Sequence, residues 1–79
     1  GDQAMILNKA QAEAVRDAIC ALNNVGMVAD IYHTDYEAGR MLCVAVGDDG
    51  RIEVSDMTSE KYEHYDDFDA FVKAYGLVP

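Results

Sequence analysis

Apolar residues near the start of the chain recur at intervals of three and four, which places them on one face of a helix. These residues are Ala12, Val15, Ile19 and Leu22. Asn8 and Gln11 have the spacing of a capping box, in which each side chain binds the backbone N–H of the other residue. The pattern therefore predicts a first helix that runs from Asn8 to about Asn23.

The interval then changes to two residues, which is typical of a strand with one buried face. Residues 25–36 follow this pattern. A turn at 37–40 comes next, and residues 41–46 form an unbroken apolar run of strand length. We expect a long first strand and a central second strand.

Turn chemistry predicts how the second and third strands pair. A three-residue loop at 48–50, with Gly50 in the left-handed conformation, places Val46 opposite Ile52. If the first hairpin has an even-numbered loop, the core face of the sheet consists of Met27, Ala29, Ile31, Leu42, Val44, Val46, Ile52 and Val54. The opposite face then consists of Val28, Tyr32, Tyr36, Met41, Cys43, Ala45 and Met57.

In the last third of the chain, we expect a short helical turn at 59–65. A second helix, capped by Asp66 or Asp67, then follows. Gly76 is placed to end that helix. The predicted fold is α+β, a two-layer α-β-β-β-α domain in which a three-stranded antiparallel sheet carries an N-terminal and a C-terminal helix.

We expect both helices to pack on the same face of this sheet. The other face then stays open to solvent or to a partner, and Tyr32, Tyr36 and Met41 form a candidate dimer face. The alternative is that the last helix covers these side chains.

The chain has 79 residues, and we expect residues 5–79 to form a single domain. Residues 1–4 precede Met5 and are interpreted as a processing or cloning remnant. A helix that spans a bilayer needs about 20 consecutive apolar residues, and no apolar run in this sequence is nearly that long. Cys20 and Cys43 lack the spacing of a disulfide framework, so we expect a cytoplasmic protein with reduced thiols.

Charge narrows the classes of partner. Fifteen acidic residues against six basic ones give a net charge of −9, which argues against direct binding to nucleic acid or to an anionic membrane. Residues 48–69 alone hold nine acids and two bases, a local balance of −7. A charged partner is therefore expected to present a basic protein surface, such as that of a nucleic-acid-binding protein.

The acidic block also contains tyrosines, and this combination suits recognition of a basic groove. The candidate partner-binding residues are Asp56, Glu60, Tyr62, Glu63, Tyr65 and Asp67. The alternative is that the charge serves only solubility.

Glu60, His64 and Asp67 have the spacing i, i+4 and i+7, which would place three metal-capable side chains on one helical face. A solvated acidic helix with a surface histidine explains the same residues. We therefore expect no metal, no cofactor and no catalytic residue, and keep a small metal-dependent enzyme only as the third hypothesis.

The segments MLCVAVGDDGRIEVSDMTSE and DDFDAFVKAYG resemble small acidic phage-encoded anti-CRISPR proteins that inhibit Cas9. One group of that family has a helix, a three-stranded antiparallel sheet and C-terminal helices, and its acidic side chains occupy a basic DNA-binding cleft. The resemblance covers about half of the chain. It implies that Asp49 and Gly50 are turn residues and that Asp56 and Glu60 belong to the acidic contact surface. The first hairpin loop of this chain contributes only one acid, Glu37, to such a surface.

Together, these observations predict a non-enzymatic interaction domain whose acidic side occupies a basic groove, and the resemblance implies an inhibitor from a phage or mobile element that mimics DNA. The second hypothesis is a homo-oligomeric structural or regulatory subunit that uses the exposed sheet face.

Overall fold

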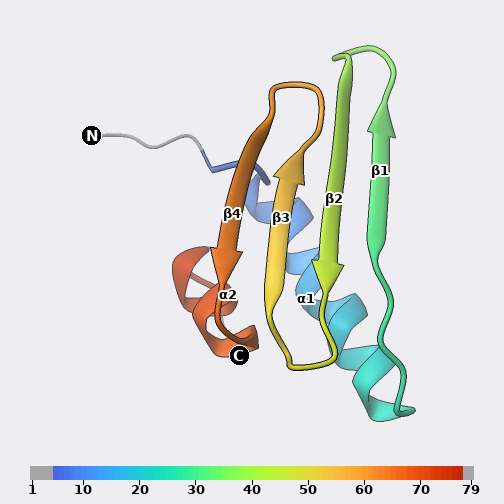
Figure 1. Cartoon of the computed structure of the whole chain (residues 1–79), viewed down its shortest axis with the longest axis vertical. Helices are drawn as coiled ribbons and strands as arrows, with labels where there is room; N and C mark the ends of the chain where they lie inside the picture. The colour runs from blue at the N-terminus through green and yellow to red at the C-terminus, as the bar shows by residue number, and fades with distance from the viewer. Residues whose placement is uncertain (1–4, 78–79) are drawn as a thin grey trace.

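The computed structural model describes residues 5–77, so the interpretation of residues 1–4 as a remnant lies outside the described residues. The described chain forms a helix, four strands and a second helix (Figure 1). Their bounds are α1 Lys9–Asn24, β1 Ile31–Asp35, β2 Arg40–Val46, β3 Ile52–Asp56, β4 Lys61–Tyr65 and α2 Phe68–Ala74. The fold is therefore α+β, as the sequence predicts. No helix in this range is long and apolar enough to cross a membrane.

The sheet has four antiparallel strands in the order β1-β2-β3-β4, so the prediction of a three-stranded sheet is wrong. The missed strand is β4, because a short helical turn was expected at 59–65. The helix-facing positions of β4 are Lys61, Glu63 and Tyr65, which pair with Asp56, Val54 and Ile52. Because two of these three side chains are charged, β4 lacks the apolar alternation that marks the other strands.

The first and last hairpins have loops of the same length. Asp35 pairs with Arg40 across residues 36–39, and Asp56 pairs with Lys61 across residues 57–60. The last loop residue is left-handed in both cases, with φ 67° at Gly39 and φ 58° at Glu60. This repeated spacing, an acid and then a base five positions later, is the signal that would have revealed β4.

The central hairpin has the predicted register. Val46 pairs with Ile52 and Val44 with Val54, and Gly50 is left-handed with φ 88°. The first hairpin loop has an even number of residues, as the predicted core face requires. Local turn chemistry therefore determines which side chains of β2 and β3 face the core.

Both helices have the predicted caps. The Asn8 side chain accepts a hydrogen bond from the Gln11 N–H at 2.8 Å, and the Gln11 side chain accepts one from the Asn8 N–H at 3.0 Å. The Asp67 side chain accepts from the Ala70 N–H at 2.8 Å, so Asp67 rather than Asp66 caps α2.

Both helices lie on one face of the sheet, where α1 crosses behind the strands (Figure 1). Buried residues of α1, α2 and the strands share one core, which excludes the alternative that the last helix covers the other face. The core consists of Ile6, Leu7, Ala12, Val15, Ile19, Leu42, Val44, Ile52, Val54, Phe71, Val72 and Leu77.

Met27 and Ala29 were predicted in the core, and this is wrong because β1 begins only at Ile31. Met27 is 55% exposed, and Ala29 is exposed as well. The Asp30 side chain accepts a hydrogen bond from the Val46 N–H at 3.2 Å, at the end where the ladder between β1 and β2 stops. The segment between α1 and β1 is therefore a surface connection.

Candidate interaction surface

Within residues 5–77, neither helix lies on the second face of the sheet, and we call this face the open face. One row of it runs across all four strands, through Tyr32, Cys43, Ser55 and Tyr62. Tyr32 is 69% exposed and Tyr62 is 58% exposed, whereas Ser55 between them is buried. The row therefore presents two tyrosines at its ends and small side chains at its centre.

The predicted dimer-face residues are also exposed. Met41 is 47% exposed on β2, and Tyr36 is 89% exposed in the first hairpin loop. Met57, in the last hairpin loop, is 55% exposed. Large apolar or aromatic side chains thus extend from the open face into the two loops at its end, an arrangement often used for protein contacts.

Acidic side chains gather at the end of the sheet where the β2–β3 loop lies, at the bottom of Figure 1, since Asp49, Glu53 and Asp66 line one hollow. We call this region the acidic end, and it consists of Asp48, Asp49, Glu53 and Asp66. A hollow of about 450 Å³ is lined by three of these residues together with Arg51 and His64.

Arg51 and His64, the two bases that line this hollow, each contact a carboxylate. Arg51 Nε lies 3.3 Å from Asp49 Oδ2, and His64 Nδ1 lies 3.3 Å from Glu53 Oε2. All four side chains are substantially exposed, so these pairs are solvent-screened and weak. The acidic end therefore remains available to a more strongly basic partner.

Asp56, a predicted partner-binding residue, is only 5% exposed. Its carboxylate accepts from Arg40 Nε at 3.1 Å and from the Thr58 N–H at 3.1 Å. Burial acts to raise the pKa of Asp56, but the hydrogen bonds from Arg40, Ser59 and Thr58 outweigh it and hold the pKa below its ordinary value. Asp56 therefore organises the last hairpin, and its side chain is not on the surface.

Glu63 and Tyr65, two further predicted contact residues, belong to a network on the helix side of β4. Glu63 Oε1 accepts from the hydroxyls of Tyr65, at 2.9 Å, and of Tyr75. Its other oxygen accepts from the Ile6 N–H at 3.1 Å. Sequence reasoning missed Tyr75 in this role, because nothing local relates the end of α2 to β4.

The remaining predicted contact residues lie in different places. Tyr62 belongs to the open face, Glu60 is exposed in the last hairpin loop, and Asp67 caps α2 beside the acidic end. Because 61–65 is a strand, its side chains alternate between the two faces of the sheet. The structure therefore does not bring the six predicted residues together.

The proposed metal ligands are also separated. Glu60 lies in a loop, His64 on the open face of β4 and Asp67 at the cap of α2, so the helical face that would join them does not exist. Within residues 5–77, no group of three or more histidine, cysteine or acidic residues is arranged to hold a metal ion.

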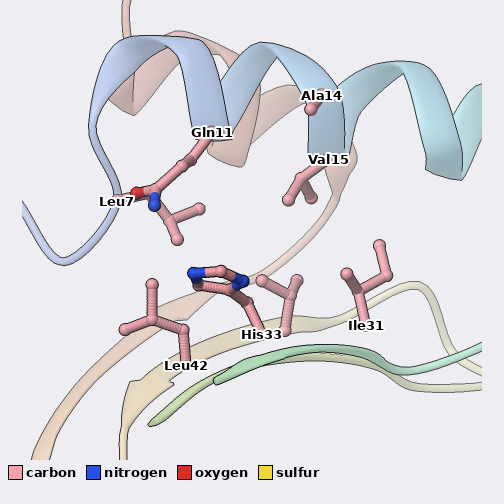
Figure 2. A pocket seen from close by; sticks show the side chains of 8 residues that line it. Leu7, Gln11, Ala14, Val15, Ile31, His33 and Leu42 are labelled. Atoms are coloured by element: carbon pink, nitrogen blue, oxygen red, sulfur yellow. The ribbon is translucent and has the colours of Figure 1, made fainter. Parts of the chain in front are cut away.

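A second hollow lies on the helix side, between α1 and the β1 end of the sheet (Figure 2). This groove has a volume of about 240 Å³. Leu7, Val15, Ile31, Leu42 and Val44 give it apolar walls, and Gln11, Ala14 and His33 complete the lining. Leu42 and Val44 of β2 are buried, whereas Ile31 is half-buried and His33 is exposed, so the groove opens to solvent on the β1 side.

Comparisons with protein-family models, with curated proteins and with solved structures found no match.

Proposed function

We propose that this protein is a non-enzymatic interaction domain that binds a basic protein surface through the open face and the acidic end. The observation that carries the proposal is the uncovered row with exposed Tyr32 and Tyr62, which adjoins Glu53 and the other acids of the acidic end. The two surfaces are continuous, because Glu53 and His64 pair on the open face and also line the hollow.

The two surfaces supply different parts of the binding free energy. Exposed tyrosines offer large contact areas at a small cost in side-chain entropy. The acids attract a basic surface over a distance and raise the association rate, an effect that salt weakens. A net charge of −9 on 79 residues makes this attraction strong at low salt.

Within this proposal, the narrower function is inhibition of a phage-targeting or other nucleic-acid-binding protein by occupation of its basic groove. Its support is the resemblance of the central hairpin and the last helix to anti-CRISPR proteins, together with the net charge. The fourth strand departs from the three-stranded sheet that this resemblance implies.

The test uses a partner captured from an extract of the source cell and then purified. Neutralising the acidic end with Asp49→Asn, Glu53→Gln and Asp66→Asn is expected to slow association at low salt, with little effect on the melting temperature. A matched control carries Glu13→Gln, Asp17→Asn and Glu37→Gln, which change the net charge equally away from the acidic end. Equal association rates for the two triple variants would reject the acidic end as the contact.

A second candidate function, a homo-oligomeric subunit, is favoured by the exposure of Tyr32, Tyr36 and Met41. An isologous dimer through the open face would bury these side chains. Light scattering then shows a dimer that Tyr32→Ala with Met41→Ala converts to a monomer. A monomer at every concentration rejects this candidate and leaves the basic partner in place.

A further inference from the structure

Among the described residues, no strand pairs with the outer edge of β1. In Figure 1, the described chain places α2 beside β4 at one edge of the sheet, while β1 ends the sheet at the other. Natural proteins usually protect such an edge with lysine, proline or a bulge. β1 reads IYHTD, without lysine or proline, and pairs with β2 in unbroken register over its whole length.

The register identifies the backbone groups that point outward. The backbone N–H and C=O of Met41 point toward the last hairpin loop, since the N–H donates to Thr58 Oγ1 at 3.1 Å and the C=O accepts from the Met57 N–H at 2.8 Å. Because these backbone groups alternate in direction along a strand, those of Leu42 point toward β1, where Leu42 pairs with His33. Tyr32 and Thr34 therefore direct their N–H and C=O groups away from the sheet.

The apolar groove lies directly beside this edge. Ile31 and His33 of β1 point toward α1, where Ala14 and Val15 form the opposite wall (Figure 2). Ala14 is exposed, so its small side chain leaves the groove accessible from solvent. A strand added beside β1 would place every second side chain on this side of the sheet, next to His33.

We propose that the β1 edge binds an extended segment of a partner protein, which adds as a further strand and inserts an apolar side chain into the groove between β1 and α1. Backbone hydrogen bonds to Tyr32 and Thr34 hold the segment, and the groove selects the side chain opposite His33. This site is separate from the acidic end, so it goes beyond the proposed function and does not depend on it.

Charge distinguishes such a partner from a second copy of this chain. Residues 23–39 contain three acidic residues, among them Asp30 and Glu37, and no lysine or arginine. Antiparallel pairing of two β1 strands would bring two acidic segments together, and like charges would destabilise the contact. The segment that fits is therefore one with apolar residues at alternate positions and lysine or arginine at its ends.

The experiment titrates the full chain with a capped octapeptide, KTVTLTVR in one-letter code, and follows backbone amides by NMR. We expect saturable binding with a Kd of about 1 mM or tighter, and slower hydrogen exchange at the Tyr32 and Thr34 amides. The charge-reversed peptide ETVTLTVE is expected to bind at least about tenfold more weakly. Equal binding of the two peptides overturns the requirement for basic ends.

Two protein variants test the geometry. Thr34→Pro removes an outward N–H at an edge position that tolerates proline, and Ala14→Phe fills the groove from an exposed position. Each is expected to weaken peptide binding at least about tenfold, with unchanged amide signals in β3. Cys20→Phe places the same side chain at an exposed position of α1 outside the groove and is expected to bind normally.

Absence of saturable binding, or normal binding by both Thr34→Pro and Ala14→Phe, overturns the strand-addition site. Self-association of the free protein that Thr34→Pro abolishes also overturns it, in favour of a second copy at this edge. None of these results predicts how the triple variants of the acidic end bind their partner, so failure of this site is distinguishable from failure of the proposed function.

Discussion

Glu63 on β4 accepts a hydrogen bond from the hydroxyl of Tyr75, which follows α2, through the same oxygen that Tyr65 contacts. Tyr75 Oη also accepts from the Leu7 N–H at 3.3 Å, and the second Glu63 oxygen accepts from the Ile6 N–H. One carboxylate and one phenol therefore join the strand at the sheet edge, the last helix and the segment before α1.

Tyr75→Phe is expected to lower the free energy of unfolding by about 1–2 kcal/mol, because a carboxylate on the helix side of the sheet loses a charge-assisted hydrogen bond. Urea unfolding at neutral pH measures the loss. Tyr36→Phe is the control, since Tyr36 is 89% exposed and the same change should leave stability within about 0.5 kcal/mol. Equal effects of the two substitutions would contradict a structural role for the Tyr75 hydroxyl.

The same network predicts a loss of stability in alkali. Burial, reinforced by Glu63, raises the pKa of Tyr65 to about 12 and raises the pKa of Tyr75 as well. Unfolded tyrosines lose their protons near pH 10, so above about pH 10 the folded state binds more protons and stability falls as pH rises. Urea unfolding from pH 9 upward should show this decline, and a Tyr65→Phe, Tyr75→Phe double variant should show a shallower one. Identical slopes would exclude the network as its source.

Gly50→Ala is expected to destabilise the protein by about 1 kcal/mol, because alanine is strained in a left-handed conformation. Gly50 has φ 88°, and a Cβ built there meets no atom within 4 Å, so the cost is a backbone cost and not a clash. Asparagine accepts this conformation better, so Gly50→Asn should lose less. Thermal unfolding of both variants provides the comparison, and an unchanged melting temperature for Gly50→Ala would refute it.

Glu60→Gly is expected to raise the free energy of unfolding by up to about 1 kcal/mol, because Glu60 occupies a left-handed conformation that a side chain disfavours. Glu60→Ala removes the same carboxylate but keeps the strain, so it should give no such gain. If both variants gain equally, relief of charge repulsion and not of backbone strain is the cause.

Local chemistry made much of this fold predictable. The capping box at Asn8 and the glycine turn at Gly50 each act over a few residues, and both appear in the structure as the sequence implies. Exposure of Tyr32 and Met41 also followed from strand alternation, once both helices were expected on the other face.

The fourth strand and the roles of its residues depend on distant partners. Glu63 faces the core because Tyr75 and the Ile6 amide, which is 57 positions away, satisfy its oxygens. Asp56 is buried because Arg40 reaches it from a neighbouring strand. Read alone, both acids resemble surface charges, which is why the sequence analysis included them among the candidate contact residues.

Ile6 is fixed through both of its backbone groups, its N–H by Glu63 and its C=O by Arg40 Nη2 at 2.7 Å. Both partners leave the ribosome after Ile6, and Glu63 leaves it last. At about 5–20 residues per second, several seconds separate the synthesis of Ile6 from that of Glu63. We therefore expect the segment before α1 to reach its final position late, after β4 has been made.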